Sequence, residues 1–211
     1  MRQTSSVGRD ARKPRRPEGK VLQTRLPQEK SRKPCRPQEK AAAEQNPLKS
    51  AIETIRSRRS IRAYQQQAVA RERIEEIVDC GRLAPTAMNE QPWDFVVLTR
   101  REDLARIPAL IGHGEFIASA AFAVLVLSRA TSYAVEDCSA AAENLLLAAA
   151  AHGIGSCWVA ATQQAYAPAV ASAFGAPADR QLIAILSFGY PAEEPQVEKR
   201  PIESVLHWDR F

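Results

Sequence analysis

The sequence predicts one layered α+β domain, in which helices and strands alternate around a central sheet. Three observations lead to this prediction. Four short apolar runs of strand length follow one another along the chain, and segments with apolar residues at helical spacing lie between them. The 211 residues are enough for one well-buried domain. The chain is 45% apolar and 25% charged, as is typical of a soluble globular protein.

The first half of this domain contains two predicted helices and one strand. Residues 48–57 have apolar side chains at helical spacing, with Pro47 at a first-turn position. Residues 94–99, DFVVLT, form a short buried strand. Residues 71–83 form a second helix, whose apolar face consists of Ile74, Ile77, Val78 and Leu83.

The second half adds a long helix and three strands. Residues 136–152 form an Ala/Leu-rich helix whose acidic first turn suits the helix dipole, and Gly153 follows it as a cap. A shorter helix covers 164–174, and residues 191–211, with three prolines, form an extended arm. The remaining strands are predicted at 122–127, 156–161 and 181–188.

Residues 1–46 form a separate basic segment ahead of the domain at 47–211. They carry 13 of the 29 basic residues in the chain and 5 of its 24 acidic residues. The domain therefore has 16 basic and 19 acidic residues, so the excess of positive charge belongs to the segment. With few large apolar side chains, the segment cannot offset its conformational entropy, and we expect it to be disordered. Three interpretations stay open: a solvated tail or over-extended gene start, a nucleic-acid or anionic-surface contact, and a targeting peptide.

The cysteines indicate a reducing compartment. They are widely spaced, form no CxxC pair and follow no signal-peptide-like stretch, so we expect free thiols in the cytoplasm. The longest apolar run, 116–127, is shorter than the roughly 18–20 residues that span a bilayer. Three scattered histidines and no paired thiols predict no metal site. The four cysteines are Cys35, Cys80, Cys138 and Cys157.

The first candidate binding cluster is RSRRSIR at residues 56–62, directly after a predicted helix. Arginine forms bidentate, charge-assisted hydrogen bonds and serine adds a short donor, so the cluster could clamp a phosphate. The alternative is a solvated basic helix end, which the helix dipole also favours.

The second cluster is APTAMNEQPW at residues 84–93, between a predicted helix and a predicted strand. Pro85 and Pro92 stiffen the loop, while Thr86, Asn89 and Gln91 supply donors and acceptors. Such a loop could bind the edge of a flat heteroaromatic ligand. The alternative is a structural turn with Trp93 in the core.

The third cluster is GIGSCW at residues 153–158. It lacks the third glycine of a dinucleotide-binding fingerprint, and it leaves a helix and enters a strand, which is the reverse order. A Rossmann site is therefore excluded. We expect the glycines to end the helix and to let the backbone approach a flat ligand.

Together these clusters, with KRP at 199–201 and HW at 207–208, resemble the nitroreductase family over residues 48–211. The resemblance implies a three-layer α/β/α sandwich that forms a domain-swapped homodimer. It also implies FMN at the subunit interface, NADH or NADPH as hydride donor, and a ping-pong reaction with a small acceptor such as a nitroaromatic or a quinone. No protein acid or base is required, so no catalytic residue is assigned.

The resemblance also assigns cofactor-binding residues. Arg58 and Ser60 would hold the FMN phosphate, with Arg59 and Arg62 nearby, and Arg200 and Lys199 would close on it from the C-terminal side. The partner subunit would supply Pro85, Thr86, Ala87 and Asn89. Backbone N–H groups at Ala160 and Ala161, where relatives often carry glycine, would face flavin N5.

Other functions stay open at this stage. One is the same fold with different chemistry, either reductive dehalogenation or flavin cleavage; for the deiodinase branch, residues 107–116 give no clear match to a lid. Another is a non-enzymatic flavin-binding protein whose basic tail contacts nucleic acid. Apart from this tail, we expect no nucleic-acid partner. His113, in a Gly-His-Gly loop, either borders the substrate opening or is an exposed loop histidine.

Overall fold

The computed structural model describes residues 49–211. The predicted tail at 1–46 and the predicted first-turn role of Pro47 lie outside this range. Among residues 49–211, no helix combines the length and the apolar character needed to cross a membrane.

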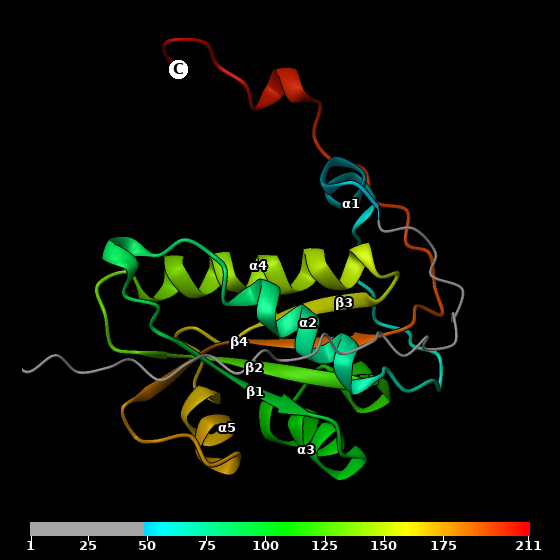
Figure 1. Ribbon diagram of the computed structural model, residues 1–211, viewed down its shortest axis with the longest axis vertical. Coiled ribbons are helices and arrows are strands. Elements are labelled where there is room, and N and C mark those ends of the chain that lie inside the picture. Colours follow the sequence, from blue (N-terminus) through cyan, green and yellow to red (C-terminus); the bar gives the residue numbers. More distant parts are fainter. Residues whose placement is uncertain (1–48) are drawn as a thin grey trace, which may run out of the picture. The chain divides into compact units, whose positions relative to one another are not determined.

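A four-stranded sheet forms the centre of the domain (Figure 1). The strands are β1 (Trp93–Leu98), β2 (Phe122–Arg129), β3 (Gly155–Ala160) and β4 (Arg180–Gly189), in the order β1-β2-β4-β3 with every neighbouring pair antiparallel. The central strands β2 and β4 are buried almost throughout, which explains their continuous apolar runs. β1 and β3 are the two edges.

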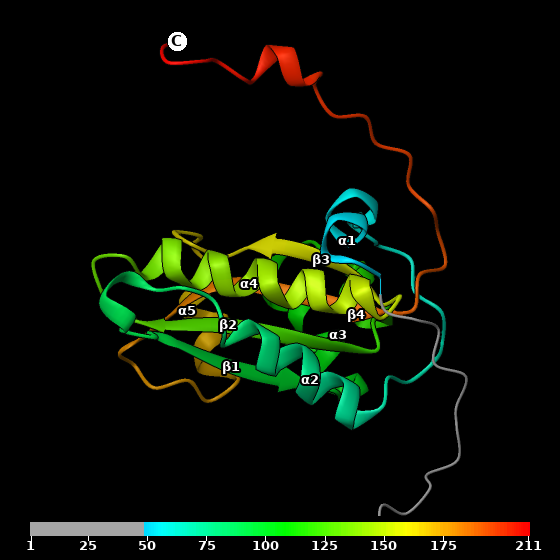
Figure 2. The ribbon, with the colours of Figure 1, turned by 45° about the horizontal axis from the view of Figure 1, so that its top comes forward.

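Helices cover both faces of the sheet (Figures 1 and 2). On one face, α2 (Arg71–Gly81) and α4 (Ala134–Ala151) pack over Phe122 and Phe188, whose rings stack with centroids 4.6 Å apart. On the other, α3 (Arg101–Ile111), the 3-10 helix η2 (Glu115–Ser119) and α5 (Ala167–Ala173) enclose a second apolar cluster. The predicted mixed α+β domain with helices in layers around a sheet is confirmed.

The first helix, α1, runs from Ala51 to Ser57, so the predicted start at residue 48 is wrong. Ser50 begins it instead through a capping box: the Glu53 N–H donates to Ser50 Oγ (3.3 Å), and the Ser50 N–H donates to Glu53 Oε2 (2.9 Å). These two bonds satisfy backbone donors that a helix start leaves free.

Two further predictions need correction. The helix predicted at 164–174 spans only Ala167–Ala173, because Gln163 has a φ of 60° and the chain turns before the helix begins. The helix α3 was not predicted; it contains Pro108 but buries Leu104, Ile107 and Ile111 on one face.

The predicted arm is largely extended, with one 3-10 turn at Ile202–Ser204, and residues 196–211 are exposed throughout. It carries several large apolar side chains in this exposed state: Val197, Ile202, Val205, Leu206, Trp208 and Phe211.

Candidate functional site

The arginine-rich segment after α1 runs along the start of the edge strand β3. Ser60 forms a parallel bridge with Ser156, and the Ile61 N–H donates to the Ser156 carbonyl at 2.8 Å. The approach is close because residue 155 is glycine: a Cβ there would lie 2.7 Å from Ile61 Cγ1. The segment therefore extends part of the sheet and holds a defined position.

Tyr64 and Glu193 fix this segment from behind. The buried Tyr64 hydroxyl donates to the Ile61 carbonyl (2.7 Å) and lies 2.8 Å from Ser187 Oγ on β4, and burial raises its pKa. Glu193 Oε1 accepts from the backbone N–H groups of Arg62 and Ala63 (3.1 Å to the latter). Neither residue was predicted, since both act through partners more than 120 positions away.

A cavity of about 330 Å³ opens beside this segment, between the end of α4 and the start of the arm. Arg58, Arg59 and Lys49 bring positive charge to it, Glu193 and Glu194 bring negative charge, and Ser156, which also lines it, is 1% exposed. Ser156 Oγ has no hydrogen-bond partner within residues 49–211. Arg58 Nε lies 3.6 Å from Glu143 on α4, which holds the guanidinium in place. A buried hydroxyl donor beside two guanidinium groups suits a phosphate.

The other predicted clamp residues are not among those that line this cavity. The Arg62 guanidinium sits over the Phe116 ring, 5.9 Å from its centroid. Ser60 contributes its backbone bridge to β3. Lys199 and Arg200 lie on the exposed arm and do not line the cavity.

The predicted ligand-binding loop at 84–93 lies at the opposite end of α4. Its Ala87 N–H donates to Asp137 Oδ1 (3.1 Å) in the first turn of α4, whereas Gly153 and Ser156, which line the cavity, follow the last turn. Because an α-helix rises 1.5 Å per residue, about 24 Å separates Asp137 from Gly153. One chain therefore does not bring Thr86, Ala87 and Asn89 to its own arginine cluster.

The free edge of β3 provides backbone groups at Ala160. The buried Ala161 donates its N–H to the Ile183 carbonyl (3.1 Å), so that N–H is already used. Backbone groups of neighbouring strand residues point to opposite sides, so Ala160 directs its N–H and C=O away from β4. The Tyr166 hydroxyl donates to the Ala160 carbonyl, and His113 contacts Tyr166 edge-on at 5.6 Å between ring centroids. The exposed His113 thus lies near this edge, while Tyr166 was not predicted.

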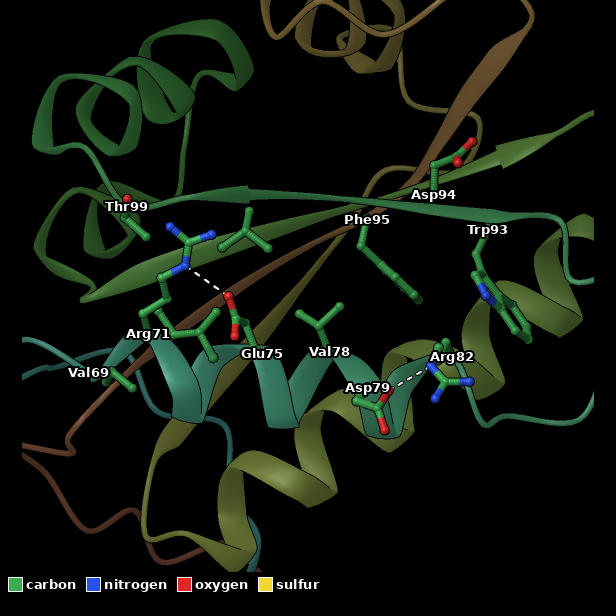
Figure 3. A pocket seen from close by; sticks show the side chains of 12 residues that line it. Val69, Arg71, Glu75, Val78, Asp79, Arg82, Trp93, Asp94, Phe95 and Thr99 are labelled. Carbon is green, nitrogen blue, oxygen red and sulfur yellow. Dashed lines mark hydrogen bonds and ion pairs between the residues drawn. The ribbon is translucent and has the colours of Figure 1, made fainter. Parts of the chain in front are cut away.

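A second and larger cavity, of about 910 Å³, is a groove between α2 and the other edge strand, β1 (Figure 3). Figure 3 shows Val78 on α2 facing Phe95 on β1, with Trp93 beside Phe95. Ion pairs flank the apolar floor: Arg71 Nε lies 2.8 Å from Glu75 Oε1, and Arg82 Nε lies 2.6 Å from Asp79 Oδ1. One side of this groove is the outer edge of β1, which pairs with no strand within residues 49–211.

Comparisons with known proteins identify a family. A family model described as the nitroreductase family matches residues 55–190. A protein of Archaeoglobus fulgidus, provisionally named NADH dehydrogenase/NAD(P)H nitroreductase, is 36% identical over 154 residues, which are 70% of this chain and 88% of that protein. The NADPH-flavin oxidoreductase of Vibrio harveyi is 24% identical over 182 residues, covering 78% of this chain and 75% of its own.

A solved structure is similar over the same region. The FMN-dependent nitroreductase of Clostridium difficile R20291 superposes with a TM-score of 0.71 and 26% identity, covering 76% of this chain and 99% of that one.

Proposed function

This chain belongs to the nitroreductase family, and from that premise we propose that it is an FMN-dependent oxidoreductase. NADH or NADPH would be the hydride donor, and a small nitroaromatic or quinone-like compound the acceptor, in a ping-pong reaction. The three cysteines among residues 49–211 are free thiols, which supports the cytoplasm as its location.

The observation that carries the proposal is the cavity beside α4, which Arg58, Arg59 and Ser156 all line, and where the buried Ser156 hydroxyl has no hydrogen-bond partner within residues 49–211. These groups fit a phosphate, which we assign to FMN, with Ser60 and Arg62 next to them. In the dimer proposed below, Lys199 and Arg200 would add their charges from the arm. FMN bound there would supply the hydride-transfer chemistry, and the protein would supply binding, orientation and electrostatics.

Two groups of the chain would act on the flavin ring. The outward N–H of Ala160 would donate to flavin N5, and the Arg62 guanidinium, held over Phe116, would place positive charge near the ring. Fixed donors and charges of this kind stabilise negative charge that develops during hydride transfer. No side chain is assigned as acid or base.

The separation along α4 supports a homodimer. The arginine cluster and the 84–93 loop lie at opposite ends of this helix, about 24 Å apart, so we propose that each flavin site takes its clamp from one subunit and its loop from the other. Pro85, Thr86, Ala87 and Asn89 would then border the flavin of the partner. Two equal sites would form in each dimer, as two-fold symmetry requires.

The arm and the groove supply the exchanged element of this dimer. The arm exposes Trp208 (79%) and Ile202 (63%), while the groove between α2 and β1 offers an apolar floor and a strand edge that no other described segment pairs with. We propose that the arm of each subunit lies in the groove of its partner, where it buries these side chains and pairs with β1.

An absorbance spectrum of the purified protein tests the cofactor assignment. Flavin bands that bleach on anaerobic addition of NADH or NADPH are expected, and the faster reductant identifies the preferred donor. A colourless protein that does not take up added FMN would refute the proposal.

Variants test the clamp. Arg58→Ala and Ser60→Ala should weaken FMN binding without unfolding the domain, since charge-assisted hydrogen bonds contribute about 1.5–3 kcal/mol each. Arg56→Ala is the matched control, because Arg56 is exposed, lies two residues from Arg58 and does not line the cavity. Equal FMN affinity in all three variants would show that the phosphate assignment is wrong.

Removal of residues 196–211 tests the exchanged arm. Light scattering should show a dimer for the full chain, and a monomer or a weaker dimer for the truncated one, while circular dichroism stays unchanged. A truncated chain that dimerises as tightly as the full chain would exclude the groove as the binding site of the arm.

A further inference from the structure

The loop between α2 and β1 adopts a backbone shape that few residues favour. Met88, Asn89 and Gln91 have φ values of 52°, 57° and 48°, and none of them is glycine. Left-handed conformations in other residues cost free energy and persist only where the surrounding structure enforces them. Something must therefore hold this loop.

The hydrogen bonds inside the loop join residues that are close in the sequence. The Asn89 and Glu90 N–H groups donate to the carbonyls of Thr86 and Ala87 (3.2 and 3.1 Å), and the Gln91 N–H donates to Thr86 Oγ1 (3.2 Å). These bonds close the turn on itself. They do not fix where the turn sits relative to α4.

Asp137 makes the bond from the loop to the helix. Its Oδ1 accepts the Ala87 N–H at 3.1 Å, it is 6% exposed, and its own N–H donates to the Tyr133 carbonyl. Its Oδ2 is buried and has no hydrogen-bond partner in the part of the chain that the structure describes. A carboxylate desolvated for so few hydrogen bonds is costly, even at a helix start that favours negative charge. A contribution to stability alone therefore does not explain why an aspartate occupies this position.

We propose that Asp137 is a positioning residue, which holds the 86–91 loop in the shape that the flavin of the partner subunit meets. This inference rests on the proposed function. The carboxylate fixes Ala87 at the first position of the turn, and the next two residues, Met88 and Asn89, are exposed. Arg129 on β2 holds the other end of the loop, where its Nη2 donates to the Glu90 carbonyl (2.7 Å) and its N–H to the Pro92 carbonyl (3.0 Å). Without Asp137, the part of the turn from Thr86 to Asn89 would therefore relax toward ordinary backbone angles and Asn89 would leave its place.

Hydrogen exchange in the flavin-free protein tests the clamp itself. The amides of Ala87, Asn89, Glu90 and Gln91 each have a known acceptor, so their protection reports the loop. Asp137→Ala should lose protection at all four, and Asp137→Asn, which keeps an acceptor oxygen, should restore it. Glu136→Ala is the matched control, because Glu136 is an exposed carboxylate in the same helical turn. Asp137→Ser, one carbon shorter, repeats the test if the alanine variant does not fold.

FMN titration of the same variants tests the consequence for the site. Asp137→Ala should weaken FMN binding by about tenfold or more, whereas Asp137→Asn and Glu136→Ala should stay within about twofold of the parent. Unchanged loop protection in Asp137→Ala, or lost protection with unchanged FMN affinity, would overturn the inference. A parent chain that binds no FMN would contradict the proposed function instead, and the exchange data would still report whether Asp137 holds the loop.

Discussion

The contact between Gly155 and Ile61 allows a quantitative test of how the arginine segment is held. Substitution Gly155→Ala would place a Cβ 2.7, 2.9 and 3.1 Å from Ile61 Cγ1, Cβ and Cγ2, where ordinary contacts are 3.4–4 Å. Neither side can yield easily: Gly155 pairs with Gly189 on β4, and the Ile61 N–H is bonded to the Ser156 carbonyl. Ile61 is also β-branched and stiff.

The expected cost is that of an overpacked core, about 1–3 kcal/mol in the free energy of unfolding. Urea denaturation followed by circular dichroism measures it, and in a domain of this size each kcal/mol lowers Tm by about 2–4 °C. Because Ile61 lies between Ser60 and Arg62, the same substitution should also weaken FMN binding.

A double-mutant cycle identifies the cause. Ile61→Ala removes Cγ1 and Cγ2, two of the three crowded atoms, so Gly155→Ala should cost less in that background, with a coupling energy of about 0.5–3 kcal/mol. Gly175→Ala is the control: it has no atom within 4 Å of the added Cβ and a φ of +76°, so it adds strain without a clash. Additive costs for Gly155→Ala and Ile61→Ala would refute the reasoning.

Two further outcomes are expected. Tyr64→Phe removes the hydroxyl that donates to the Ile61 carbonyl and lies near Ser187, and should lower the free energy of unfolding by about 1–3 kcal/mol in urea denaturation. A loss below about 0.5 kcal/mol would show that this anchor is weak. Burial, then the charge of Arg73, lowers the pKa of His152 below 6.5, and Arg73 Nη1 lies 2.8 Å from Nδ1. The fold thus favours neutral His152, so the contribution of this residue to stability is complete above pH 6.5 and is lost as the pH falls toward the lowered pKa. Denaturation of the parent and of His152→Gln at a series of pH values should therefore differ in that window. Equal pH profiles would contradict this expectation.

The strands were the most predictable part of the fold. β2 and β4 lie between two helical layers, so both of their faces need apolar side chains and the sequence shows unbroken runs. The order of the strands and their antiparallel pairing were not predicted, because they depend on connections that local periodicity does not describe.

Helix boundaries and α3 depended on finer signals. Ser50 and Glu53 form the capping box that starts α1 at Ala51, three residues after the predicted start at residue 48. The spacing of Leu104, Ile107 and Ile111 would have revealed α3, but Pro108 argues against a helix interior because it removes a backbone donor. Burial of this apolar face evidently outweighs that cost.

The candidate site likewise contains residues that the sequence indicated and residues that it did not. Sequence clusters pointed to the Arg58 segment and to the 84–93 loop, because each is continuous in the chain. The residues that hold them were not found: Tyr64 works through Ser187, and Asp137 through Ala87 fifty positions away. The helix dipole alone accounts for acidic residues in the first turn of α4, so the sequence does not indicate that Asp137 contacts the loop.

The length of α4 has a genetic consequence. In the proposed dimer, a chain with a defective arginine cluster still carries an intact loop, and a chain with a defective loop still carries an intact cluster. A mixed dimer of the two would combine both defects in one site and leave the other site wholly normal. Co-expression of two inactive alleles should therefore restore up to half of the flavin content per mixed dimer, whereas a site built from one chain alone would keep the defect of that chain in both subunits.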